Sequence, residues 1–260
     1  MTESVLHEVD GAVATITINR PAARNALTAE TKVALLAALR DCTTDAAVRA
    51  VILTGAGQAF CSGQDLREHA DLLASATALD TVRQHYNPII ETIVGMPKPV
   101  IAALPGVAAG AGAGLAFACD FRVAAERASF LLAFARVGLG ADSGTSWTLP
   151  RLVGSARATD LLMLAEPIDS ATALRLGLLT SVVPDDEVRA AAAALAERLA
   201  AGPTLAFAAI KEGLLYSSGH SLRESLAKEA DLQTRLGETT DHQAATKAFL
   251  EKQTPVFVGR

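Results

Sequence analysis

Aromatic residues are scarce in this chain: they make up 4% of its 260 residues, whereas 50% of the sequence is hydrophobic. The interior must therefore be built mainly from Ala, Leu and Val. Acidic residues outnumber basic ones, since 23 Lys and Arg stand against 28 Asp and Glu and the formal net charge is -5. A chain with this balance and no long basic run lacks the usual footprint of a nucleic-acid-binding protein. We expect no nucleic-acid partner.

Cysteine is rare as well, and its spacing excludes two classes of site. Cys42, Cys61 and Cys119 are widely separated and form no CxxC pair, which argues against a disulfide framework and against a metal site. No uninterrupted apolar run reaches the roughly 18 residues of a membrane span, and the first residues do not resemble a signal peptide. We therefore expect no bound metal, no membrane association and a cytoplasmic location.

Hydrophobic periodicity predicts alternating strands and helices. The predicted strands cover 14–18, 50–54, 100–104, 121–124 and 181–183. The predicted helices follow Thr28 and Gly110 and cover 76–95, 171–178, 187–201 and a charged tail over 222–252. No repeat or low-complexity linker separates these pieces, which favours one α/β domain with a helical C-terminal extension.

The first predicted helix has a clear start and two sides. Thr28 is the expected N-cap, because a threonine hydroxyl can accept from a free N–H of the first turn. The spacing of Val33, Leu35, Leu36 and Leu39 predicts an apolar side, with Lys32 and Arg40 on the polar side.

Two glycine-rich turns follow predicted strands, at 59–66 and 106–114. The run from Gly110 to Gly114 invites comparison with dinucleotide-binding loops, but the GxGxxG spacing is broken. The nearest acid, Asp120, lies only six residues beyond Gly114, whereas such loops have one about 20 residues on. Close helix packing explains the same glycines. Two tight turns side by side could instead offer two backbone N–H donors to one oxyanion.

A carboxyl group stands alone in a third glycine-rich stretch, at 138–144. Asp142 is surrounded there by glycine and apolar residues. Partial desolvation would raise its pKa and suit it to exchanging protons near neutral pH. Asp142 is therefore the leading catalytic candidate.

Together with the segment 19–27, these turns resemble the crotonase superfamily of acyl-CoA enzymes, the enoyl-CoA hydratase/isomerase group. The resemblance extends through 101–110, 147–154 and 173–178 and covers essentially the whole chain. It implies an α/β spiral of ββα units, with residues 1–200 as the core that holds the CoA-thioester site. Residues 201–260 would then be a helical region for oligomerisation and completion of that site, and the chain would form homotrimers or hexamers.

The resemblance also implies roles for particular residues. The backbone N–H groups of Gln64 and Ala111 would hold the thioester carbonyl of an acyl-CoA. The CoA moiety, part of the substrate rather than a permanently bound cofactor, would contact residues from both ends of the chain: Arg24, Ser62, Asp65, Leu66, Phe249 and Lys252.

The two glutamates of the family's hydratases would fall at Gly114 and Phe134, neither of which can transfer a proton. Asp142 instead matches the aspartate of members that resemble ring-epoxide isomerases and 4-chlorobenzoyl-CoA dehalogenases. We expect isomerase chemistry, in which Asp142 moves a proton to and from an enolate.

Several alternatives remain open from the sequence. They are a hydratase of the same family, a dehalogenase that uses Asp142 as nucleophile, and a catalytically silent CoA-binding protein in which Asp142 caps a helix that begins near Ser143. His85 and Tyr86 could supply pocket residues for the dehalogenase, although such residues more often pack in the core or face solvent. Serine hydrolysis is disfavoured because no Gly-x-Ser-x-Gly motif is present.

Overall fold

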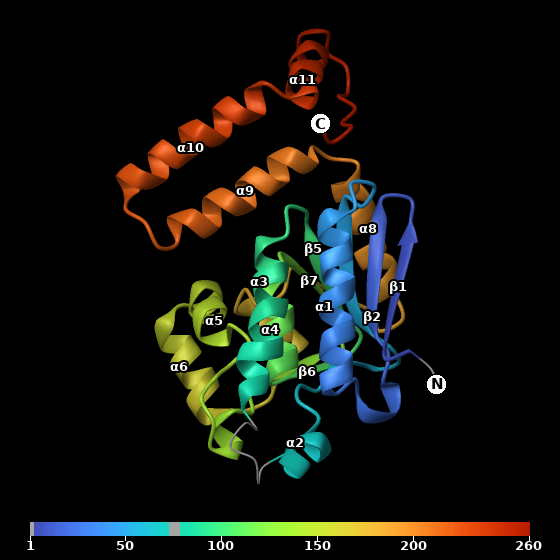
Figure 1. Cartoon of the computed structure of the whole chain (residues 1–260), viewed down its shortest axis with the longest axis vertical. Helices are drawn as coiled ribbons and strands as arrows, with labels where there is room; N and C mark the ends of the chain where they lie inside the picture. Colours follow the sequence, from blue (N-terminus) through green and yellow to red (C-terminus); the bar gives the residue numbers. More distant parts are fainter. Residues whose placement is uncertain (1–2, 73–78) are drawn as a thin grey trace.

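The computed structural model describes residues 3–72 and 79–260 (Figure 1). The strands are β1 (Val5–Asp10), β2 (Val13–Ile18), β3 (Ala50–Gly55), β4 (Ala59–Cys61), β5 (Val100–Leu104), β6 (Val107–Ala109), β7 (Phe121–Ala125), β8 (Ser129–Leu131), β9 (Ile168–Asp169) and β10 (Ser181–Val183). The α-helices are α1 (Ala29–Thr44), α2 (Leu66–Leu72), α3 (Asn87–Gly95), α4 (Ala111–Ala118), α5 (Thr145–Val153), α6 (Ser155–Leu164), α7 (Ser170–Arg175), α8 (Val188–Ala200), α9 (Thr204–Ser217), α10 (Leu222–Gly237) and α11 (Thr240–Leu250).

The strands form two sheets that the chain visits in turn. The larger has the order β1-β2-β3-β5-β7-β10 and the smaller β4-β6-β8-β9. Each of β3, β5 and β7 in the larger sheet is followed directly by a short strand of the smaller one, and the chain then passes through helical segments. This recurrence is the spiral of ββα units that the family resemblance implies, and the fold class is confirmed.

The central strands β3 and β5 of the larger sheet are buried on both faces. Along β3, Val51 and Leu53 belong to the main core, whereas Ala50 and Ile52 pack against the alanine-rich helix α8. A strand that is covered on both sides needs apolar residues at every position. This requirement explains the continuous apolar runs at 50–54 and 100–104.

Helices α9, α10 and α11 extend from one end of the core (Figure 1). Helix α9 is tied to the core by Lys211, whose ammonium lies 2.7 Å from a carboxylate oxygen of Asp120 and 3.0 Å from the carbonyl oxygen of Lys98. The chain end is tied back by Asp241, whose carboxylate accepts from the N–H groups of Val258 and Gly259. The domain boundary at residue 200 stays a prediction.

Several predicted elements are confirmed, and the errors have physical reasons. Thr28 caps α1 through its hydroxyl, which accepts from the N–H of Thr31 at 3.2 Å. The helix predicted over 76–95 is confirmed from residue 80 onward, where α3 is preceded by one π-helical turn, Val82–Tyr86, and its first residues lie outside the described part. Strand β1, helices α6 and α9 and the short strands β4, β6, β8 and β9 were not predicted. Strands of two or three residues are too short for a period to be recognised.

The orientation predicted for α1 is wrong at two positions. Lys32 is buried and Val33 is exposed. Lys32 shares one helical face with Leu35, Leu39 and Cys42, which are all buried. The i, i+3, i+7 spacing on this face was the available signal, and the charge of lysine concealed it.

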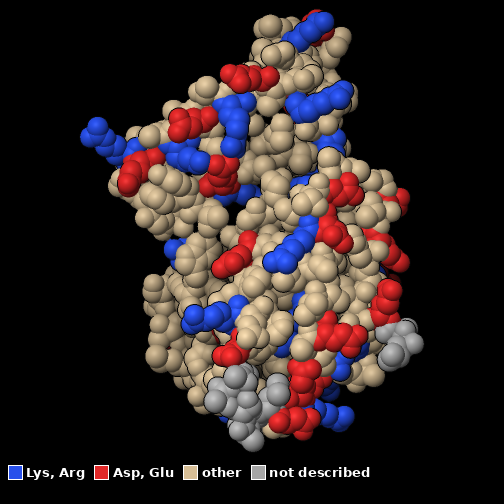
Figure 2. Space-filling view, in the orientation of Figure 1, with Lys and Arg blue, Asp and Glu red and all other residues tan. Residues whose placement is uncertain are grey.

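Charged side chains of both signs are interspersed over the face shown in Figure 2. Among the described residues no single helix is long and apolar enough to cross a membrane. Helices α8 and α9 meet that criterion only as a pair, and they are bent by 101°.

Candidate active site

Two tight turns meet where adjacent parallel strands of the smaller sheet end. Strand β4 leads into Gly63 and Gln64, and β6 leads into Gly110 and Ala111. A Cβ atom at Gly63 would lie 2.8 Å from the carbonyl oxygen of Ala109 and 3.3 Å from the backbone nitrogen of Ala111. Glycine therefore allows the two turns to touch, as the sequence predicted.

The backbone N–H groups of Gln64 and Ala111 are free to bind a ligand. Neither has a hydrogen-bond partner within the described residues. Ala111 is the first residue of α4, where helical N–H groups are unpaired and the helix dipole favours negative charge. Gln64 is held by its neighbours, because Leu27 donates to the carbonyl of Gly63 and accepts from the N–H of Asp65. The pair can act as an oxyanion hole.

Asp142 lies in an irregular segment that leads into α5. Its neighbour Ser143 is buried with φ at 50°, a conformation that non-glycine residues rarely adopt and that often marks a functional site. The Ser143 hydroxyl donates to Asp142 Oδ1 at 2.9 Å. Helix α5 begins at Thr145, with Gly144 as its N-cap and no side-chain capping bond. The alternative in which Asp142 serves as a helix cap is therefore wrong.

The Asp142 carboxyl has an environment suited to proton transfer. Burial raises the pKa of Asp142 above its ordinary value, although the hydrogen bond from Ser143 and the positive charge of Lys32 oppose that shift. A carboxyl whose pKa is raised in this way is a stronger base when ionised at neutral pH.

A buried polar cluster beside this carboxyl was missed by sequence reasoning. Lys32 Nζ donates to Gln64 Oε1 at 2.9 Å and to Thr81 Oγ1 at 2.5 Å. The Tyr86 hydroxyl donates to the same Gln64 Oε1 at 2.7 Å, and the Lys32 ammonium lies 4.9 Å from the centre of the Tyr86 ring. The side chain of one oxyanion-hole residue is thus fixed from α1 and from the segment before α3.

Residues 8–260 match the family model described as enoyl-CoA hydratase/isomerase. The chain belongs to the enoyl-CoA hydratase/isomerase family. A Rhodobacter capsulatus protein named a probable enoyl-CoA hydratase is 44% identical over 99% of this chain and 98% of its own length. The 1,2-epoxyphenylacetyl-CoA isomerase of Escherichia coli is 38% identical over the full length of both chains. A crystal structure of a Mycobacterium abscessus protein, provisionally described as an enoyl-CoA hydratase/isomerase, superposes with a TM-score of 0.95 at 46% identity and covers 98% of this chain and 100% of its own.

Gly114 and Phe134, the positions at which the family resemblance would place the glutamates of a hydratase, carry no carboxylate. A Cβ atom at Gly114 would lie 2.6 Å from Ser143 Cβ and 2.7 Å from the Ser143 carbonyl oxygen, so the segment that carries Asp142 fills this space. Phe134 is buried in the main core. The Thr145 hydroxyl also faces Gly114, and it is the buried side-chain oxygen without a partner among the described residues.

Four of the residues expected to contact CoA lie together in this enoyl-CoA hydratase/isomerase fold. The Ser62 N–H donates to the Arg24 carbonyl at 3.1 Å, and the Arg24 side chain is exposed. Leu66, 65% exposed, begins α2 immediately after Asp65. The Asp65 carboxylate is engaged by Arg20 at 2.9 Å. The Asp65 N–H donates to the Leu27 carbonyl and the Asp65 carbonyl accepts from the N–H of His69, so the polar groups of Asp65 already have partners. Burial raises the pKa of Asp65, but Arg20 and the N–H groups of α2 outweigh burial and lower it overall.

Phe249 and Lys252 are not brought to this cluster within one chain. Phe249 lies on α11 and Lys252 follows it, whereas α2 is at the opposite end of the molecule (Figure 1). Both side chains are exposed. If they contact CoA, they do so in the site of another copy.

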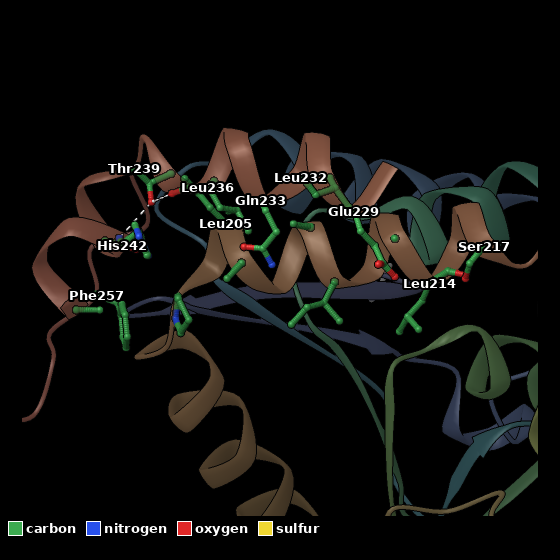
Figure 3. Close-up of a pocket in the computed structure, with 17 residues that line it drawn as sticks. Leu205, Leu214, Ser217, Glu229, Leu232, Gln233, Leu236, Thr239, His242 and Phe257 are labelled. Carbon is green, nitrogen blue, oxygen red and sulfur yellow. Dashed lines mark hydrogen bonds between the residues drawn. The ribbon is translucent and has the colours of Figure 1, made fainter. Parts of the chain in front are cut away.

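A separate groove of about 590 Å³ lies between α9, α10 and α11. Figure 3 shows Leu205 and Leu214 on one side of it and Leu232 and Leu236 on the other. This groove contains none of the candidate catalytic residues.

Proposed function

We propose that this chain is an enoyl-CoA isomerase that shifts a double bond or isomerises a ring in the acyl part of a CoA thioester. Asp142 removes a proton from the carbon next to the thioester, and the Gln64 and Ala111 N–H groups stabilise the enolate oxygen. Asp142 then returns the proton to a distant carbon of the conjugated system. One carboxylate is sufficient, because the same group serves first as base and then as acid.

The sealed position at Gly114 is the observation that carries this proposal. A hydratase of this family activates water between two glutamates, and here the first position is filled by the backbone of Ser143 while the second is a buried phenyl ring. Asp142 supplies the half-buried carboxyl at this site. The name of the Escherichia coli relative supports isomerase chemistry, whereas the name of the Rhodobacter capsulatus relative favours a hydratase as the second candidate.

The test is to mix the purified protein with a 3-enoyl-CoA, a 2-enoyl-CoA and an aryl-epoxide CoA thioester and to follow each product by mass spectrometry. We expect isomerised products and no water addition. Net hydration of the 2-enoyl thioester would establish the hydratase instead, and binding without turnover of any of them would indicate a silent CoA-binding protein.

Replacing Asp142 by asparagine tests the residue assigned to proton transfer. Asp142→Asn keeps the size and most hydrogen bonds but removes the base, so turnover should fall by about 10² to 10⁴ while thioester affinity stays within a few-fold. Solvent deuterium should no longer enter the carbon next to the thioester. Asp160→Asn, a change on the exposed side of α6, is the matched control and should exchange normally. Wild-type exchange rates in Asp142→Asn would refute the mechanism.

We further propose that the chain forms a homotrimer or hexamer in which Phe249 and Lys252 complete the CoA site of a neighbouring copy. Their exposure and the position of α11 at the opposite end of the molecule from α2 (Figure 1) support this arrangement. The apolar groove between α9, α10 and α11, with Ile210 and Leu214 exposed along α9, supplies a surface for contact between copies.

A further inference from the structure

Lys32 is a buried cation whose bonds go to neutral side chains. It is 1% exposed, and no carboxylate lies within 4.0 Å of its ammonium among the described residues. Burying an ammonium without an ion-pair partner is unfavourable, and a leucine or methionine would fill the same space at lower cost. The charge at this position therefore calls for an explanation other than packing.

The charge of the other buried lysine of the core, Lys98, is explained by its contacts with a helix end. Lys98 donates to the backbone carbonyl oxygens of Cys42 and Asp45 at the C-terminal end of α1. Free carbonyls and the helix dipole favour a cation there. Lys98 thus stabilises the fold locally, and it provides a matched comparison for Lys32.

The hydrogen bonds of Lys32 reach one of the catalytic candidates, Gln64. Its hydrogen bond to Gln64 Oε1, together with that from Tyr86, fixes the side chain of a residue whose backbone N–H belongs to the oxyanion hole. A donor must be held in position before charge develops if it is to stabilise a transition state. Losing either hydrogen bond would leave Gln64 Oε1 with a single donor and hold the side chain less firmly.

The ammonium also faces charged and titratable groups on every side. Asp142 and Glu68, on the segment before α5 and on α2, favour its charged form, although burial outweighs them and lowers the pKa of Lys32. His85 and Tyr86 lie beside it on the π-helical turn. In return, Lys32 favours the ionised form of Asp142, which is the form that accepts a proton.

We propose that Lys32 is a positioning residue for the acyl-CoA reaction: its buried ammonium fixes the Gln64 side chain and adds a positive charge to the site that holds Asp142. This inference rests on the proposed function for its catalytic consequence, but its electrostatic part can be measured without turnover.

The test compares Lys32→Gln with Lys98→Gln. Lys32→Gln retains a hydrogen-bond donor for Gln64 or Thr81 but removes the charge. Loss of a nearby positive charge disfavours the ionised carboxyl, so the acid limb of kcat/KM for 3-hexenoyl-CoA should move to higher pH. The carboxyl resonance of Asp142 in ¹³C-aspartate-labelled protein, assigned by its loss in Asp142→Asn, should shift its titration by the same amount. Lys98→Gln should leave both titrations at their wild-type positions.

Tyr86→Phe tests the positioning part while it leaves the charge in place. The loss of one bond to Gln64 should lower turnover of 3-hexenoyl-CoA several-fold without moving the acid limb. This variant also keeps the proposal testable if Lys32→Gln does not fold, as judged by circular dichroism.

The proposal is overturned if Asp142 titrates in Lys32→Gln as in the wild type, if Lys98→Gln shifts the titration equally, or if Tyr86→Phe turns over at the wild-type rate. If the wild type isomerises no thioester, the proposed function fails, whereas the carboxyl titration still decides whether Lys32 controls Asp142.

Discussion

Asp142 and its neighbour Ser143 combine two properties that each lower the stability of the folded protein. Its carboxyl is half-buried, and burial raises its pKa. Its neighbour Ser143 holds a left-handed backbone conformation that most residues avoid. Strain and a desolvated carboxyl at one place are typical of catalytic sites, where stability is given up for reactivity.

The raised pKa of Asp142 predicts a pH dependence of both activity and stability. The base must be ionised, so turnover should fall as the pH drops through a pKa that lies above the usual aspartate range. A folded-state pKa above the unfolded one means that the ionised form destabilises the native state at pH values above that pKa. Asp142→Asn should therefore be more stable than the wild type at neutral pH.

This stability gain should vanish below the pKa of an unfolded aspartate, because the wild-type carboxyl is then protonated in both states. Urea unfolding of the two proteins at several pH values measures the difference. A gain that is the same at every pH, or a loss at neutral pH, would show that the charge of Asp142 is not disfavoured by folding.

The start of α4 shows how an element can be placed for chemistry. Gly110, with φ at 50°, turns the chain from β6 directly into the helix, so the N–H of Ala111 points out of the first turn without a partner. A short buried helix that begins in this way presents its positive end to a ligand.

Ala111→Pro should remove one oxyanion donor and leave the helix intact. Proline is well tolerated at the first position of a helix, since its N–H would be unpaired there. Turnover should fall by about 10² to 10³. Ser155→Pro makes the same change at the exposed start of α6 and should leave turnover unchanged. Circular dichroism confirms that both variants fold, and full activity in a folded Ala111→Pro protein would rule out this donor.

The contact between α4 and the Asp142 segment predicts different costs at two helical glycines. A Cβ atom at Gly114 would overlap Ser143, whereas a Cβ atom at Gly95 meets nothing within 4 Å. Gly114→Ala should therefore lower the free energy of unfolding by about 1–3 kcal/mol through overpacking. Gly95→Ala should be neutral or stabilising, because alanine restricts the unfolded chain. Urea denaturation measures the stability of the two variants. Equal stability would mean that the segment around Ser143 can shift to accommodate the added methyl group without cost.

At the scale of the whole molecule, the residues proposed to contact CoA are divided between two ends. Arg24 and Ser62 lie beside the oxyanion hole, while Phe249 and Lys252 lie beyond α10 on an outlying arm (Figure 1). A single copy cannot bring them together without moving the arm. Assembly of several copies is the arrangement that would unite them.

Phe249→Ala combined with Lys252→Ala should weaken binding of a CoA thioester about tenfold, while the melting temperature stays nearly unchanged because both side chains are exposed in the protomer. Lys247→Ala, on the same helix and 77% exposed, is the control and should bind normally. Calorimetry measures affinity, and light scattering gives the number of copies. A stable monomer with full affinity would contradict the shared site.

The sequence alone determined the features that depend on interactions between residues close together in the chain. The Thr28 cap, the apolar runs of β3 and β5, the glycine turns before Gln64 and Ala111, and Asp142 as the carboxyl of an apolar turn were all predicted from residue type and spacing. The same motifs, in order, indicated the family. Caps, turns and periodicity depend on neighbours within a few residues, so a linear pattern records them.

Only the tertiary structure decided which long-range neighbours meet. It placed Lys32 inward against Gln64, joined Tyr86 to the same oxygen, filled the space at Gly114 with Ser143 and set α11 far from Arg24. A lysine is exposed in most helices, and nothing local distinguishes one whose charge faces a carboxyl 110 positions along the chain. Packing of distant segments fixes such contacts, because each depends on the shape and charge of the surface that the rest of the fold presents.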